Sequence, residues 1–207
     1  ASLWGTRNPV RRGRAGARAY AVGDIHGRLD LLEPLLAKIE QDAAARPRKQ
    51  TYIIFLGDLI DRGPESAGVV ERLRNYRPDF ASPIFLAGNH EEVMLRILDG
   101  EPDILADWLK FGGVECLASY GIDPAGLTRM DPSKAVELLR SKVPRTHIEF
   151  LGSFADTFRF GDYLFVHAGI RPGLTLDEQD PFDLRWIREP FLSGADEHGL
   201  IVVHGHT

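Results

Sequence analysis

The strongest constraint on the fold is a set of five short apolar runs, each of which leads into polar residues. The runs are AYAV (19–22), TYIIFL (51–56), PIFLA (83–87), DYLFV (162–166) and LIVV (200–203). Apolar runs of this length, bounded by turn residues, predict buried strands. Asp, His or Asn follows each run, either directly or after one glycine.

Helical patterns separate these strands. Apolar spacing predicts a helix over 29–39, whose opening turn Pro34 perturbs. Pro64 suits the first position of a second helix, and a third helix with Val93 on its apolar face ends at Asp99. Strands that alternate with helices predict the α/β class.

The chain is predicted to form one domain, since 207 residues suit a single large core. This domain covers 19–207 and carries a helical insertion around 92–151, where glycines and prolines break the helices. TFRF (157–160) and YLFV joined by Gly-Asp predict a hairpin. Residues 1–18 contain five arginines and no apolar signal-peptide core, so we expect a solvated basic arm; a contact for an anionic partner is the alternative.

Composition narrows the classes of function. The formal net charge of −5 gives no reason to expect nucleic acid as a partner. No apolar run approaches the roughly 20 residues that cross a bilayer, so no membrane partner is expected. Cys116 is the only cysteine, which excludes a disulfide framework and favours a reducing, cytoplasmic location.

The polar residues after the strands predict one shared site, because ligands of α/β sheets gather beyond the carboxyl ends of strands. Taken alone, each has an ordinary explanation: an Asp caps a helix or forms a turn, and a His lies at the surface. Polar residues at five strand ends together favour a single site at which these side chains meet. The candidates are Asp24, His26, Asp58, Asn89, His167 and one of His204 and His206. Oxygen and imidazole donors without sulfur suit two divalent ions that share a carboxylate, which we expect to be Asp58.

Five motifs resemble those of the calcineurin-like metallophosphoesterases. They are GDIHG (23–27), GDLIDRG (57–63), GNHE (88–91), VHAG (166–169) and GHT (205–207), in family order. The resemblance is greatest to the phosphoprotein phosphatase branch, in the bacterial and phage-type serine/threonine phosphatases. It implies a four-layer fold in which two mixed β-sheets pack as a central sandwich flanked by helices. Because that fold continues beyond GHT, we expect this chain to lack its C-terminal strands.

The resemblance also implies a role for each candidate residue. Asp24 and His26 would hold the first metal, Asp58 would bridge, and Asn89, His167 and His206 would hold the second. His206 is chosen over His204 because it matches GHT. His90 would be the general acid, oriented by Asp61. The phosphate would be bound by Arg62, Arg188, Asn89 and His90.

The implied activity is hydrolysis of phosphate monoesters, chiefly phosphoserine and phosphothreonine in proteins, by in-line attack of a hydroxide held between two metal ions. Manganese is the expected metal, with iron or zinc as alternatives, and a phosphorylated protein or peptide is the expected partner. The alternative is a dinucleoside polyphosphate hydrolase of the same superfamily, although His26 and Asp61 favour the phosphatase. A non-catalytic binding module is less favoured because the metal ligands, His90, Asp61 and Arg62 are all present.

Overall fold

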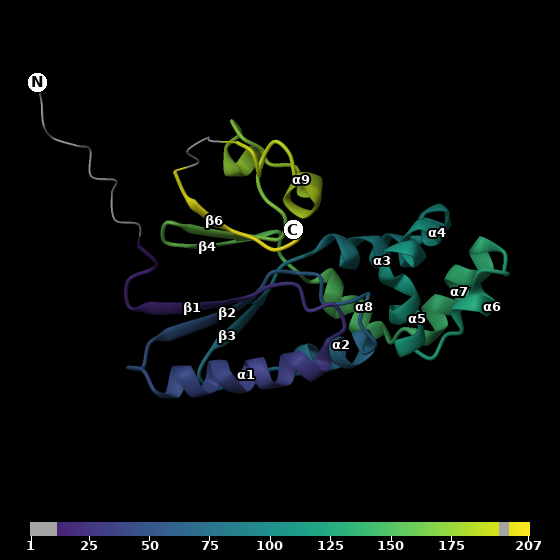
Figure 1. Ribbon diagram of the computed structural model, residues 1–207, viewed down its shortest axis with the longest axis horizontal. Helices are drawn as coiled ribbons and strands as arrows, with labels where there is room; N and C mark the ends of the chain where they lie inside the picture. The colour runs from purple at the N-terminus through teal and green to yellow at the C-terminus, as the bar shows by residue number, and fades with distance from the viewer. Residues whose placement is uncertain (1–11, 195–198) are drawn as a thin grey trace, which may run out of the picture.

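Two three-stranded sheets lie face to face in the computed structural model, which describes residues 12–194 and 199–207 (Figure 1). The first sheet contains β1 (Ala17–Val22), β2 (Gln50–Phe55) and β3 (Ser82–Phe85), in that order and all parallel. The second contains β4 (Thr157–Phe160), β5 (Tyr163–Val166) and β6 (Ile201–Val203). It is mixed, because β4 runs antiparallel to β5 and β6 runs parallel to it.

Helices cover the outer face of the first sheet. They are α1 (Leu29–Ala44), α2 (Ser66–Arg74), α3 (Asn89–Asp99) and α8 (Arg145–Gly152). Their apolar faces enclose the fully buried Ile53 and Phe55 of β2. The inner face of the sheet packs on the second sheet through Ile54, Leu86 and Phe165.

Helix α9 (Pro181–Trp186) covers the far face of the second sheet, where Leu184 packs against Leu164 and Val166. A short 3₁₀ turn (Leu176–Glu178) precedes it. The order of layers is therefore helices, sheet, sheet and helix, which confirms the predicted α/β four-layer arrangement. One detail differs: the described strands of the first sheet are all parallel, whereas the resemblance implied two mixed sheets.

Short helices fill the segment between α3 and α8 and lie beside α3 at one end of the molecule (Figure 1). They are a 3₁₀ turn (Pro102–Ile104), α4 (Leu105–Trp108), a π turn (Leu109–Gly113), α5 (Val114–Ser119), α6 (Pro124–Leu127) and α7 (Pro132–Lys142). Asp123 and Asp131 cap α6 and α7, each directly before a proline that begins the helix. Broken helices were expected in this part of the chain.

Several local predictions can be compared with the structure. Gly161 and Asp162 form the predicted turn, since Phe160 pairs with Tyr163. Pro64 does not begin a helix: the backbone of Glu65 is not helical (φ −125°, ψ 41°), and α2 starts at Ser66. Helix α1 includes Pro34 and continues past 39 to Ala44.

The predicted basic arm lies mostly outside the described residues, because 1–11 are not described. From Arg12 onward the chain is held: the Arg12 N–H donates to the Asp162 carboxylate, and the Arg14 guanidinium lies 3.3 Å from the Tyr52 hydroxyl. No helix in the described part of the chain is long and apolar enough to cross a membrane.

Candidate metal centre

The loops that carry the candidate residues have unusual backbone angles. Among the described residues other than glycine, positive φ occurs at His26 (46°), Asp58 (51°), Asp61 (73°), Arg62 (65°) and His206 (67°). Each costs about 1–3 kcal/mol and persists only where the surroundings hold it. Here the Asp58 carbonyl accepts the N–H groups of Ile25 and His26, and the Asp61 N–H donates to Ser66 Oγ. All five are candidate site residues, so the strain is confined to the site.

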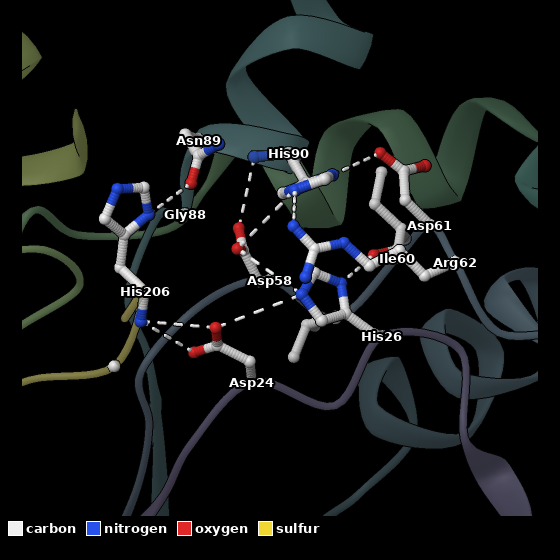
Figure 2. Close-up of polar contacts among 12 residues, drawn as sticks. Asp24, His26, Asp58, Ile60, Asp61, Arg62, Gly88, Asn89, His90 and His206 are labelled. Carbon is white, nitrogen blue, oxygen red and sulfur yellow. Dashed lines mark hydrogen bonds and ion pairs between the residues drawn. The ribbon is translucent and has the colours of Figure 1, made fainter. Parts of the chain in front are cut away.

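Asp58 lies among three imidazoles. Its side chain is 2% exposed, and Oδ2 is 3.4 Å from His167 Nε2. The same oxygen is 3.8 Å from His26 Nε2 and 3.9 Å from His90 Nε2 (Figure 2). Burial alone would raise the pKa of Asp58, but the bond to His167 and the charges of His167 and His90 lower it to about 2. The structure thus puts an ionised carboxylate in the position that a bridging ligand needs.

The first candidate metal position is formed by Asp24, His26 and Asp58. His26 Nδ1 lies 2.9 Å from the Ile60 carbonyl, which makes it the protonated nitrogen and leaves a lone pair on Nε2. This Nε2 is buried without a hydrogen-bond partner in the described structure and lies 3.9 Å from Asp24 Oδ2. Burial also lowers the pKa of His26, which favours the neutral ring. An unpartnered acceptor beside two carboxylates fits a cation.

The second candidate position surrounds Asn89 Oδ1, which lies 3.0 Å from His167 Nε2 and 2.9 Å from His206 Nδ1. His167 Nδ1 is occupied by the Leu56 carbonyl at 2.7 Å. Burial lowers the pKa of His167, but the bond to Asp58, the Asp58 charge and the Leu56 carbonyl together raise it above its ordinary value. The surroundings of His167 Nε2 therefore favour a bound cation, either a proton or a metal ion. Burial, with the charge of His167, lowers the pKa of His206 to about 4, so this ring is neutral and able to act as a ligand.

His90 and Asp61 form a buried pair beside these positions. His90 Nδ1 lies 2.6 Å from Asp61 Oδ2, and Trp108 Nε1 donates to the same oxygen at 2.7 Å. Burial lowers the pKa of His90, but the bond to Asp61 and the charges of Asp58 and Asp61 raise it above its ordinary value. By distance, His26, Asp58 and His90 could also hold an ion together. However, Arg62 Nη2 lies 3.3 Å from His90 Nε2, and a guanidinium there opposes a cation on that nitrogen (Figure 2).

The two candidate phosphate arginines differ in placement. The exposed Arg62 side chain contacts His90 of the buried His90–Asp61 pair. Arg188 is exposed, and within the described residues its guanidinium makes no hydrogen bond or ion pair. Its charge contributes to the lowered pKa of His206. The nearby Arg185 is already bonded to Asp156 and Glu92. A phosphate role for Arg188 stays a prediction.

The other histidine near the C-terminal motif, His204, makes its contacts with residues that are not proposed ligands. His204 Nδ1 is 3.0 Å from the Gly205 carbonyl, and its ring meets that of Phe191 at 5.1 Å. By contrast, the His206 backbone N–H donates to both Asp24 oxygens at 3.2 Å. A ligand role for His206 stays a prediction.

Glu91 has a part in the site that sequence reasoning did not assign. It is fully buried, and its carboxylate accepts the N–H groups of Asp58 (2.8 Å), Leu59 (2.7 Å) and Gly88 (3.1 Å). Burial and then the Asp58 charge raise the pKa of Glu91 to about 7. Glu91 thus holds the loop that presents Asp58. Its position three residues after Gly88, at the start of a helix, was the available signal.

The chain matches a known family model over nearly its whole length. The model, described as calcineurin-like phosphoesterase, covers residues 17–207. A crystal structure of a putative diadenosine tetraphosphatase superimposes with a TM-score of 0.55 at 22% identity, covering 86% of this chain and 62% of that one. This second likeness supports the fold.

Two curated relatives carry different names. A symmetrical bis(5'-nucleosyl)-tetraphosphatase of Dechloromonas aromatica is 28% identical over 156 residues, which is 75% of this chain and 45% of the relative. Serine/threonine-protein phosphatase 1 of Salmonella typhimurium is 34% identical over 94 residues, which is 45% of this chain and 38% of the relative. The chain thus spans less than half the length of either relative.

Proposed function

The chain belongs to the calcineurin-like phosphoesterase family, and from this premise we propose that it hydrolyses phosphate esters at a centre of two divalent metal ions. The observation that carries the proposal is the convergence of His26, His90 and His167 on the Asp58 carboxylate. The unpartnered His26 Nε2 adds support, because a purely structural cluster would satisfy that nitrogen.

Each residue then has a defined task. Asp24 and His26 would hold one ion, Asn89, His167 and His206 the other, and Asp58 both. Bound divalent ions would lower the pKa of water and neutralise charge on the phosphate oxygens. We propose manganese, with iron or zinc as alternatives, since oxygen and imidazole donors accept all three.

The remaining residues act on the substrate itself. Arg62 would bind the phosphate oxygens, and Arg188 would do so from the side of His206. As the oxygen of water bonds to phosphorus, the bond to the leaving oxygen breaks. Arg62 lies 3.3 Å from His90 Nε2, so it would have to move from this nitrogen to the phosphate before Nε2 could carry a proton. His90 would then give that Nε2 proton to the leaving oxygen, while Nδ1 donates to Asp61.

We propose dinucleoside polyphosphates as the first substrate class. Support comes from the relatives: the tetraphosphatase matches 75% of this chain, whereas the protein phosphatase matches 45%. This reverses the order expected from the sequence motifs, in which the phosphoprotein came first. It rests on the names of relatives that are more than twice as long as the matched segment.

Phosphoserine and phosphothreonine in proteins are the second candidate, and the acid pair favours them. The alkoxide that leaves a phosphoserine needs a proton, whereas a nucleotide leaves as a stable phosphate anion. The buried His90–Asp61 pair, with its 2.6 Å bond, is suited to the harder leaving group. A phosphorylated protein would then be the partner.

One comparison tests both substrate proposals. The manganese-loaded protein is assayed for kcat/KM on diadenosine tetraphosphate and on a phosphoserine peptide. A larger value on the tetraphosphate supports the first candidate, and a larger value on the peptide supports the second. No turnover of either by protein with two verified metal ions would overturn the proposed function.

A further inference from the structure

We infer that Trp108 is a positioning residue for the general acid, acting through Asp61. The inference rests on the proposed function, because an oriented acid matters only where a leaving group must be protonated. Its basis is one oxygen atom: Asp61 Oδ2 accepts both Trp108 Nε1 at 2.7 Å and His90 Nδ1 at 2.6 Å. Trp108 is 2% exposed and Asp61 is fully buried, so water does not compete for this atom.

The second carboxylate oxygen shows why the tryptophan matters. Asp61 Oδ1 is buried and has no hydrogen-bond partner in the described structure. A carboxylate held by His90 alone could rotate about its Cβ–Cγ bond, so that neither oxygen keeps a fixed position relative to His90 Nδ1. The indole N–H removes this freedom, because it selects Oδ2 and fixes the carboxylate plane. His90 Nδ1 therefore meets an acceptor in one place.

The backbone that follows Trp108 packs closely against Arg62 and against the Trp108 ring. We call residues 108–113 the clamp segment; it spans the end of α4 and the π turn. The Gly112 carbonyl accepts the Arg62 N–H at 2.9 Å, and a Cβ at Gly112 would lie 2.6 Å from that nitrogen. A Cβ at Gly113 would lie 2.6 Å from the Trp108 ring. The clamp segment is thus bonded to Asp61 through the Trp108 side chain and to the Arg62 backbone through the Gly112 carbonyl.

A purely structural role would explain the burial of Trp108, which also packs in the main apolar core. It would not explain why the indole N–H meets the oxygen that orients His90. The two roles predict different results when the N–H is removed and most of the ring volume is kept. Trp108→Phe makes that change.

The kinetic test compares two phosphate monoesters that differ in leaving group, 4-nitrophenyl phosphate and phenyl phosphate, on protein of verified metal content. The nitrophenolate departs readily without a proton, whereas the phenolate needs more help from an acid. Trp108→Phe is expected to lower kcat on phenyl phosphate by about tenfold or more, on 4-nitrophenyl phosphate by less than about threefold, and to leave KM nearly unchanged.

Trp186→Phe is the matched control. The Trp186 indole N–H is buried but donates to no partner within the described residues, so the same chemical change removes no bond to Asp61. This variant is expected to show equal effects on both esters. Equal losses on both esters in Trp108→Phe would overturn the inference.

A crystal structure of Trp108→Phe supplies a readout that needs no activity. The expected result is an Asp61 carboxylate turned away from the 2.6 Å contact with His90 Nδ1, with the metal ligands unmoved. An unchanged contact would overturn the inference whatever the kinetics. Failure of the proposed function is distinct, since it would appear as wild-type protein that turns over no phosphate ester.

Discussion

His167 Nε2 lies 3.4 Å from Asp58 Oδ2, although the two residues follow strands of different sheets. The candidate metal centre therefore spans the junction of the two sheets. Asp24, Asp58 and Asn89 come from the end of the first sheet, and His167 and His206 from the end of the second. Docking of the sheets is what completes the ligand set.

Asp58→Asn should weaken both metal ions together. The substitution removes the negative charge of Asp58. In the described structure this is the only carboxylate within 4 Å of the Nε2 atoms of all three histidines, His26, His90 and His167. Affinity for each ion should fall by at least about 100-fold, beyond the usual cost of losing a residue that merely supports a ligand. Calorimetric titration with Mn²⁺ measures this. The control Asp30→Asn alters an exposed carboxylate paired with Arg28 and should bind normally; two full equivalents on Asp58→Asn would contradict the bridge.

His90→Ala should lower kcat while leaving metal binding nearly intact. The imidazole contacts Asp61 and Arg62, and the proposed reaction uses it as a proton donor. A loss of about 10²–10⁴-fold is expected on a phosphoserine peptide. Metal analysis of the same sample decides the interpretation: loss of both ions would mean that His90 is a ligand.

Much of this site was predictable from the sequence because glycine and proline mark the strand ends so clearly. Asp24, Asp58 and His167 follow apolar runs, and parallel strands bring their carboxyl ends to one edge. The hairpin at Gly161 followed from turn chemistry alone. The turn and the position of each residue at a strand end depend on neighbours in the chain, which is why a single sequence reveals them.

Features that depend on distant contacts could not be predicted in this way. The left-handed backbone at Asp58 and Asp61 is imposed by bonds to Glu91 and Ser66, and those residues favour no such angle by themselves. Trp108 resembles any apolar residue of a helical stripe until its indole is seen beside Asp61. Pro64 suits a first helical position, but the non-helical backbone of Glu65 moves the start of α2 to Ser66.

Gly112→Ala should destabilise the fold more than Gly121→Ala. Both glycines have positive φ, 111° and 72°, so alanine is strained at either. Only at Gly112 would the new Cβ also collide, 2.6 Å from the Arg62 nitrogen; at Gly121 nothing lies within 4 Å. We expect a loss of about 1–2 kcal/mol at Gly121 and more at Gly112. Urea unfolding of both variants measures the difference, and equal losses would mean that the clamp segment moves freely.

The Glu71 carboxylate should make stability depend on acid pH. Hydrogen bonds from His147 and then Arg74 lower its pKa from 4.5 to about 2. A carboxyl with a lowered folded pKa contributes stability that is present above pH 4.5 and is lost as the pH falls towards 2. His147 is itself buried and bonded to Tyr120, so the contact joins α2 to α8 and to the residue that follows α5.

Glu71→Gln tests this dependence on metal-free protein. The gap in unfolding free energy between wild type and Glu71→Gln should be larger at pH 7 than at pH 3, as measured by urea titration at both values. A gap of the same size at both pH values would show that the ionised form of Glu71 contributes nothing.

The most direct test of the two-metal centre is anomalous scattering from crystals of the wild-type protein grown with Mn²⁺. Two strong peaks are expected about 3.5–4 Å apart, with the Asp58 carboxylate between them. One peak should lie beside Asp24 and His26, and the other beside Asn89, His167 and His206. A single peak, or manganese bound anywhere else while these side chains keep their present contacts, would contradict it.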